Sequence, residues 1–265
     1  MKKKIVVLIA SFLFICCKRN SDFSKNYDEK RKIISEMIES KSEETLKSFI
    51  QAEQIDSLRL KLIFDTSYQY YLKNDSANFR YWNKYSNAIA KKLSDSSKIA
   101  ESHWDLGNFF YKISIPDSSY YHYFQAYDRY KNDKNAFYAA RMLLNMAVIQ
   151  EDVKDFTGSE ATLIKTLKIF ENQEKHLQLY LAYSTLGVVY NGMEDSTNSW
   201  NYHQKALIEA EILKDSSKIS GVYNNIGVMQ QDNKKYYSSI ENFQKALQYD
   251  LSLIHISEPT RRTPI

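Results

Sequence analysis

The sequence predicts an all-α protein, a solenoid of stacked antiparallel helix hairpins. Residues that punctuate turns are scarce: the chain has 6 glycines and 3 prolines, and Pro116 is the one proline before residue 250. Sheets and β-hairpins depend on frequent turn residues, so this scarcity favours helices. Small residues also recur about every 40 residues, as in a repeat protein. Both observations predict stacked units that contact mainly their neighbours.

Three small positions define the repeat. Each copy places a small residue after an aliphatic one, a serine twelve residues later, and Ala or Thr seven residues after the serine. This spacing describes two helices that approach each other closely at their small residues. Such a hairpin cannot bury its apolar face alone, so it must stack on the next copy. The predicted packing residues are Gly107, Ser119, Ala126, Ala147, Ser159, Gly187, Ser199, Ala206, Gly227, Ser239 and Ala246.

The pattern resembles the tetratricopeptide repeat (TPR), which places Leu and Gly or Ala in its first helix and Ala, an aromatic residue and Ala in its second. The resemblance covers residues 59–250 and implies a concave groove of first helices that binds a peptide or protein segment. The period is longer than usual, serine replaces the second-helix alanine, and Thr166 replaces the later one. We expect the serine hydroxyls to bond back to the preceding turn. Longer helices or looser connectors should absorb the extra residues.

The array divides into five copies, of which the first is degraded because Thr66 and Ser67 stand where Leu and Gly should. Upstream, residues 18–58 carry apolar residues at helical spacing. They predict an atypical helix pair that shields the end of the stack. The five copies are expected near residues 60–97, 100–135, 140–175, 180–215 and 220–250.

Residues 1–17 resemble a lipoprotein-type signal peptide. Three lysines precede an eleven-residue apolar run, too short for a comfortable membrane span, which ends at the chain's two cysteines. The resemblance implies lipidation at Cys17, or else at Cys16. It also implies a membrane-anchored protein in the periplasm of a Gram-negative envelope. The alternative is ordinary signal cleavage, or an uncleaved anchor with incidental cysteines.

Residues 251–265 are expected to lie outside the fold. Pro259 and Pro264 interrupt the helical pattern, and LSLIHISEPTR resembles a translated sequencing adapter, which predicts an artefactual or disordered tail. The formal net charge of +4 comes from this tail and from the lysines near the N-terminus. The body between them is neutral. Its total charge therefore does not suggest a nucleic-acid partner, which would need a basic surface, and we expect none to bind this segment.

No catalytic or metal-binding motif predicts an enzyme. The histidines are dispersed, whereas a metal site needs several converging ligands, so we expect neither a metal nor a cofactor. Aromatic clusters such as YYHYFQAY favour packing between helices over stacking on single-stranded nucleic acid. The dispersed histidines are His103, His122, His176 and His203. Four aspartates that are each followed by serine are interpreted as N-cap residues at helix starts. These are Asp95, Asp117, Asp195 and Asp215.

The candidate binding residues are polar and aromatic side chains of the first helices. Asparagine can donate and accept at once and so hold a peptide backbone, while Tyr190 offers an apolar wall. The groove candidates are Asn108, Arg141, Asn145, Tyr190, Asn224 and Asn225. The alternative is that these side chains are solvated or serve contacts between helices.

The predicted function is an exported, non-enzymatic scaffold that binds a protein or peptide partner and is held at the membrane by its lipid anchor. A second hypothesis rests on LLNMAVIQ, GSEA and YNNIGV, which resemble the sensor regions of bacterial TPR-containing histidine kinases. That resemblance implies the truncated periplasmic sensor region of a two-component kinase, or of a TPR-containing transcriptional regulator.

Overall fold

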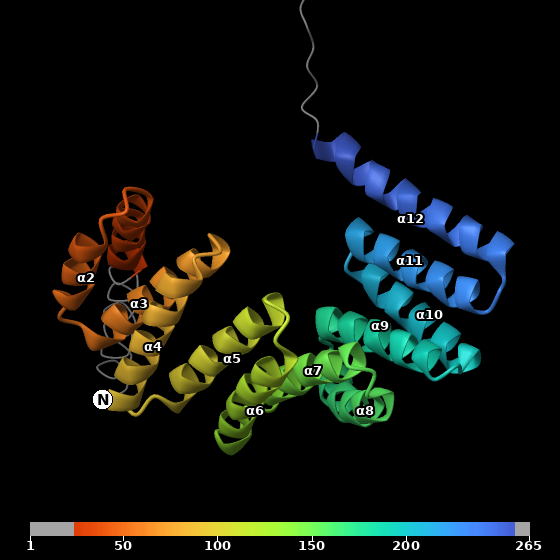
Figure 1. Cartoon of the computed structure of the whole chain (residues 1–265), viewed down its shortest axis with the longest axis horizontal. Helices are drawn as coiled ribbons and strands as arrows, with labels where there is room; N and C mark the ends of the chain where they lie inside the picture. The colour runs from red at the N-terminus through yellow and green to blue at the C-terminus, as the bar shows by residue number, and fades with distance from the viewer. Residues whose placement is uncertain (1–23, 258–265) are drawn as a thin grey trace, which may run out of the picture. The chain divides into compact units, whose positions relative to one another are not determined.

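The computed structural model describes residues 24–257, and every element in that range is a helix (Figure 1). The chain divides into two compact units, residues 1–106 and 107–265. A first helix covers residues 24–39. The helices that follow are α2 (Glu43–Gln51), α3 (Asp56–Leu72), α4 (Ser76–Lys92), α5 (Ser96–Lys112), α6 (Pro116–Asn132), α7 (Ala136–Asp152), α8 (Phe156–Asn172), α9 (His176–Gly192), α10 (Ser196–Ile212), α11 (Ser216–Asp232) and α12 (Tyr236–Ser257).

The backbone repeats at half the interval that the sequence shows. Helices α3 to α11 each contain 17 residues and are joined by three-residue links. The middle residue of each link has a positive φ, for example 58° at Asn74 and 57° at Lys134. The residue after it donates its backbone N–H to a carbonyl five residues back, as Asp75 does to Tyr70 over 3.0 Å. This arrangement is the left-handed helix end that satisfies orphan carbonyls. The long period is therefore accommodated by longer helices, and the connectors stay tight.

Six helices in the described range begin after an Asp or Asn whose side chain accepts the backbone N–H three residues on. Asp195 accepts from Asn198 over 3.0 Å, and Asp95 accepts from Lys98 over 2.9 Å. Satisfying one orphan donor in this way stabilises a helix start. The prediction for Asp117 is wrong: α6 begins at Pro116, its cap position is Ile115, and Asp117 lies inside the first turn.

The small residues pack the two helices of each hairpin together. Each repeat serine donates its hydroxyl to the carbonyl of the small residue on the first helix, over 2.8 Å in all four copies. The serines therefore bond across the hairpin, and the expectation that they bond back to their own helix is wrong. In the degraded copy the direction is reversed, since Ser67 on α3 donates to the Phe79 carbonyl on α4 over 3.3 Å. The hairpin contact survives because either helix can supply the hydroxyl. The four donors are Ser119, Ser159, Ser199 and Ser239, and their acceptors are Gly107, Ala147, Gly187 and Gly227.

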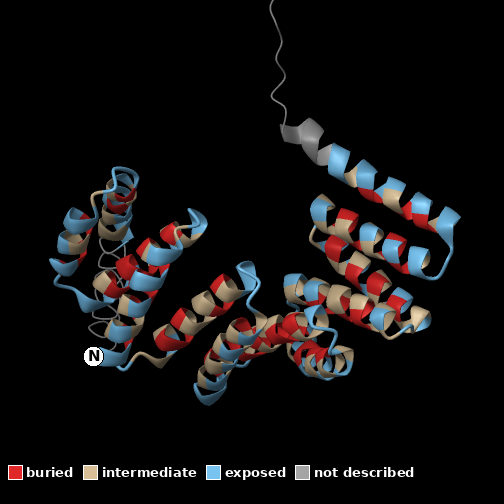
Figure 2. Ribbon diagram, viewed as in Figure 1, coloured by how far each residue is buried: buried red, intermediate tan, exposed pale blue. Residues whose placement is uncertain are grey.

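Each helix buries one side against its neighbours and exposes the other, as the alternating colours of Figure 2 show. In the second unit, the core runs from Ala140 on α7 to Met229 on α11 without a break. A smaller core in the first unit contains Phe64 on α3 and Ile99 on α5. A core that continues from hairpin to hairpin, with no shared centre, is that of a solenoid.

Both ends of the described chain are helical. At the start, Ile34 and Ile38 of the first helix and Leu46 of α2 are fully or almost fully buried. At the other end α12 continues to Ser257, past Asp250, where the sequence suggested that helix stops. Pro259, like the predicted lipidation sites Cys16 and Cys17, lies outside the described residues. Within the described range, no helix is both long and apolar enough to cross a membrane.

Candidate functional site

The first helices of the hairpins form one face of the second unit. Here α7 contacts α9 and α9 contacts α11, whereas no comparable contact joins α8 to α10 or α10 to α12 in the described range. Hairpins whose first helices lie closer together than their second helices must curve, with the first helices on the inside. We call this side the inner face. It consists of the residues of α7, α9 and α11 that face solvent on the concave side of the second unit.

Successive repeats place equivalent residues in rows across the inner face. One row is apolar and consists of Val148, Val188 and Val228, the last of which is 41% exposed. A parallel row is polar and consists of Asn145, Thr185 and Asn225. The residues of each row are about 40 positions apart, so they stand side by side on neighbouring helices. The inner face is therefore an apolar strip with polar side chains beside it.

The asparagines of the inner face differ in their hydrogen bonding. Asn225 donates to the Ser184 hydroxyl over 3.3 Å, which joins α11 to α9. Asn145 is partly buried and Asn224 is exposed, and neither side chain has a hydrogen-bond partner among the described residues. Both amides can therefore donate and accept toward a ligand.

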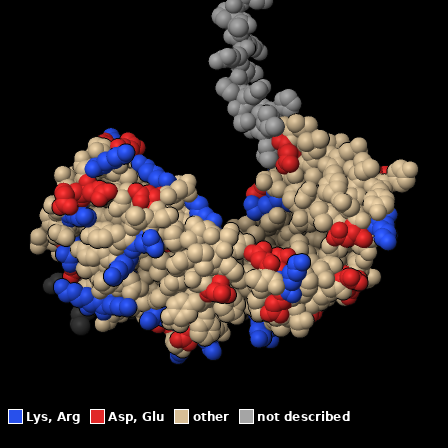
Figure 3. Space-filling view, in the orientation of Figure 1, with Lys and Arg blue, Asp and Glu red and all other residues tan. Residues whose placement is uncertain are grey.

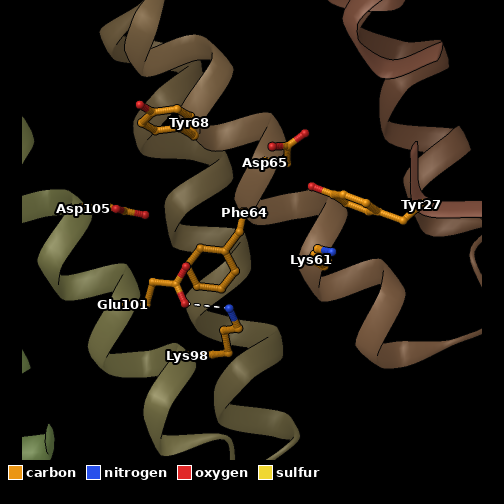
Figure 4. A pocket seen from close by; sticks show the side chains of 8 residues that line it. All are labelled: Tyr27, Lys61, Phe64, Asp65, Tyr68, Lys98, Glu101 and Asp105. Atoms are coloured by element: carbon orange, nitrogen blue, oxygen red, sulfur yellow. Dashed lines mark hydrogen bonds and ion pairs between the residues drawn. The ribbon is translucent and has the colours of Figure 1, made fainter. Parts of the chain in front are cut away.

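The first unit has a pocket on the equivalent side of its hairpins. Its volume is about 260 Å³, and it lies between α3 and α5 (Figure 4). Asp65 on α3 and Asp105 on α5 occupy the repeat position that Asn145 and Asn225 hold in the second unit. The residues that line the pocket are Tyr27, Lys61, Phe64, Asp65, Tyr68, Lys98, Glu101 and Asp105.

Two of the three carboxylates in this pocket are neutralised within the chain. Asp65 accepts from Arg31 over 2.9 Å, and Glu101 accepts from the Lys98 ammonium over 2.6 Å. Asp105 has no hydrogen-bond partner among the described residues. Burial raises the pKa of Asp105 to about 8, with a further rise from the nearby charge of Glu101 and an opposing effect of Lys98. At neutral pH this carboxyl is therefore mostly protonated.

Charge and ligand chemistry are otherwise unremarkable over the described residues. Figure 3 shows Lys and Arg interspersed with Asp and Glu on both units. No group of three or more His, Cys, Asp and Glu side chains in residues 24–257 is placed to hold a metal ion. Two histidines serve packing: His203 is 1% exposed, and His122 stacks on Phe110 at 5.3 Å between ring centroids, whereas His176 bonds to Glu209 over 2.8 Å.

Comparisons with known proteins identify the fold. No protein-family model matches the chain, and no curated protein matches it significantly. The solved structure of BtubC from P. vanneervenii matches with a TM-score of 0.68 and 15% identity, over 90% of this chain and 96% of that one. A kinesin light chain with TPR-like repeats from Podosopora anserina matches with a TM-score of 0.60 and 11% identity, over 80% and 100%. This chain has a TPR-like fold.

A third match of the same kind is a Rap protein complexed with Competence and Sporulation Factor. The TM-score is 0.63 and the sequence identity is 13%. The match covers 77% of this chain and 58% of the Rap chain. At these identities the likeness concerns the fold alone.

Within the TPR-like fold, the six predicted groove residues fall into two groups. Asn145, Asn224 and Asn225 lie on the first helices α7 and α11 as described above, and Arg141 lies one turn before Asn145. The Arg141 guanidinium is 5.8 Å from the Phe137 ring centroid, and burial lowers its pKa.

The other two predicted residues take part in packing inside the array. Asn108 accepts the Tyr123 hydroxyl over 2.7 Å within its own hairpin. Tyr190 stacks on Tyr202 with ring centroids 5.3 Å apart, and its hydroxyl donates to Glu160 on α8. Their assignment to ligand binding stays a prediction, and a ligand that used these two side chains would have to replace the contacts within the chain.

Sequence reasoning missed the valine row and the α3–α5 pocket. The valines follow the small residues directly at the repeat interval, so the register of the repeat was enough to find them. The pocket gave a weaker signal, because Asp65 and Asp105 belong to different hairpins and the copy around α3 is degraded.

Proposed function

We propose that this protein is a non-catalytic scaffold that binds an extended protein segment along the inner face of its first helices. The observation that carries the proposal is the valine row on the inner face, partly exposed at Val148 and Val188 and 41% exposed at Val228, beside Asn145, whose amide has no hydrogen-bond partner among the described residues. An extended chain presents alternating backbone donors and acceptors, which asparagine matches on both counts. Apolar contacts with the valines would supply the remaining affinity.

Two further observations support this function. Rigid helices hold the inner face, so a ligand meets residues that are already in place, and a preformed site loses less entropy on binding. One matching fold, the Rap protein, was solved with Competence and Sporulation Factor bound. TPR-like repeat folds of this kind suggest protein–protein interaction.

The test is a selection of displayed peptides on the full chain, followed by affinity measurement with a labelled peptide from the selection. Val188→Asp places a charge in the centre of the valine row, and we expect it to weaken binding at least about tenfold. Asn224→Ala should weaken it by a smaller factor. The matched control is Ile208→Asp on α10, a second helix, where the side chain is 55% exposed. Equal affinity of Val188→Asp and the native protein would refute the assignment to the inner face.

We also propose that the scaffold is exported and anchored to the membrane through Cys17, or alternatively Cys16. The support is the sequence of residues 1–17, which lie outside the described residues. Labelling cells with an alkyne fatty acid tests this proposal. Label that persists after both cysteines are changed to serine would show that neither carries the lipid.

A further inference from the structure

The α3–α5 pocket differs in chemistry from the rest of the first-helix side. Where the later repeats carry Asn145, Thr185 and Asn225, this pocket carries Asp65 and Asp105. At the position of the valine row, α3 carries Tyr68. The pocket is thus acidic and aromatic where the inner face of the second unit is amidic and aliphatic. A pocket with this composition therefore suits a different chemical group from the one that the inner face suits.

Asp105 is the carboxyl that lacks a cation. The charged and titratable groups around it are Lys61, Asp65, Tyr68 and Tyr71 from α3, Lys98 and Glu101 from α5, and Tyr27 and Arg31 from the first helix. Asp65 is paired with Arg31 and Glu101 with Lys98. The Lys61 ammonium lies 3.6 Å from the Tyr27 ring centroid, so it is already engaged. One cation supplied from outside would complete the pairing of the three carboxylates.

The pocket already contains one contact between a cation and an aromatic ring. Lys98 holds its ammonium 5.0 Å from the Phe64 ring centroid, in the geometry of a cation–π contact. Tyr68 is 50% exposed and stacks on Tyr71, at 6.1 Å between ring centroids. In Figure 4 the Tyr68 ring and the Asp105 carboxylate extend toward each other from α3 and α5. Tyr68 and Asp105 thus line the same pocket from different helices.

We propose that the α3–α5 pocket binds an arginine side chain of a protein or peptide ligand, with its guanidinium paired to Asp105 and stacked on Tyr68. The inference rests on the proposed function and names one residue of the ligand. Arginine fits better than lysine because its planar guanidinium stacks on a ring and donates two parallel hydrogen bonds to a carboxylate. It is also less strongly hydrated than an ammonium group, so it enters a partly buried site at lower cost.

Binding should release a proton. The free Asp105 carboxyl has a pKa of about 8, and a guanidinium beside it favours the ionised form. At pH 7 the cation must therefore displace the proton, while at pH 9 the carboxylate is already ionised. The affinity should rise about tenfold between pH 7 and pH 9, in proportion to the ionised fraction.

The experiment titrates the full chain with N-acetyl-arginine amide and follows binding by NMR and calorimetry. The comparison ligand is N-acetyl-citrulline amide, which has nearly the same shape without the charge. We expect shifts in residues of α3 and α5 with the arginine probe, at least about tenfold weaker binding of citrulline, and proton release at pH 7. Lysine amide should bind more weakly than arginine amide.

The variant that tests the pairing is Asp105→Asn, which installs the residue that other repeats carry at this position, Asn145 and Asn225, and so should fold. We expect it to lose the arginine probe and the pH dependence. Asp128→Asn, an exposed carboxylate on α6, is the control and should bind like the native protein. No binding of arginine amide, or equal binding of citrulline or by Asp105→Asn, would overturn the proposal.

This outcome is separable from the proposed function. Val188→Asp lies in the second unit and should leave binding of the arginine probe unchanged. If selected peptides bind the valine row while the arginine probe fails, the scaffold stands and the pocket assignment falls. If the arginine probe binds and no selected peptide binds the valine row, the pocket assignment stands and the assignment of peptide binding to the inner face falls.

Discussion

At the residue scale, the smallest side chains are placed by what faces them. Gly187 lies beneath the His203 imidazole, and a Cβ there would come within 2.4 Å of the ring. Gly107 and Gly227 face the rings of Tyr123 and Phe243 in the same way. In the remaining copy the small residue is Ala147, whose equivalent partner is Leu163, not a ring. The repeat thus tolerates one methyl group more on the first helix when the second helix presents an aliphatic side chain.

This pairing predicts that Gly187→Ala lowers the free energy of unfolding by about 2 kcal/mol, because the added methyl group overpacks the contact with His203. The double variant with His203→Leu reproduces the pairing of Ala147 with Leu163 and should recover most of the loss. The measurement is urea unfolding monitored by circular dichroism. Gly221→Ala is the control: its Cβ would meet only the Tyr180 hydroxyl at 3.4 Å, so the change should be neutral or slightly stabilising.

His203 makes the fold sensitive to acid. Its Nδ1 is buried without a partner among the described residues, and burial lowers its pKa from 6.5 to about 4. The unfolded histidine binds a proton below pH 6.5, whereas the folded one does so only below about 4. The free energy of unfolding is therefore at its full value above pH 6.5, where His203 is neutral in both states, and it falls as the pH decreases toward 4. The loss amounts to about 3 kcal/mol.

Replacing His203 by Phe, which the next repeat carries as Phe243, should remove this part of the pH dependence. The measurement is the urea midpoint of the native protein and the variant between pH 7 and pH 4.5. Parallel curves for the two proteins over this range would contradict the assignment to His203.

At the element scale, the hairpin register could be predicted from sequence and the helix ends could not. The serines and glycines that fix the register recur at a constant interval, so the sequence alone aligns them. The left-handed residues that end the helices do not, because Asn74, Lys134 and Glu174 share no turn signature and none of the positive-φ positions is a glycine. Their conformation is imposed by packing on both sides of the link. The carbonyl that accepts each serine hydroxyl could not be predicted either, because it depends on the distance between the two helices of the hairpin.

Lysine in a left-handed link is strained relative to glycine. We expect Lys154→Gly, at φ 64° between α7 and α8, to raise the free energy of unfolding by about 0.5–1 kcal/mol, since glycine adopts this conformation without steric cost. The gain is limited because glycine also increases the entropy of the unfolded chain. Lys168→Gly inside α8 is the control and should lower stability by about 1 kcal/mol. Thermal unfolding of both variants decides the point.

At the scale of the whole molecule, the array extends its core by copying one interface. The packing of α10 on α11 holds Leu207 against the core of the second unit. Its equivalent on α12, Leu247, is 57% exposed, and the neighbouring Ile240 is 53% exposed. The outer side of α12 is therefore an interface surface of the repeat that no helix among residues 24–257 covers. Exposed apolar surface of this kind favours association.

We expect the full chain to self-associate through this side of α12. Leu247→Lys together with Ile240→Lys should shift the protein toward monomer in analytical ultracentrifugation and leave its helical circular dichroism unchanged, because neither side chain contributes to a filled core. Leu207→Lys, the same substitution one repeat earlier, should instead destabilise the fold by about 2–3 kcal/mol, since it places a charge against the core. A native protein that stays monomeric at high concentration would show that the exposed side of α12 does not drive association.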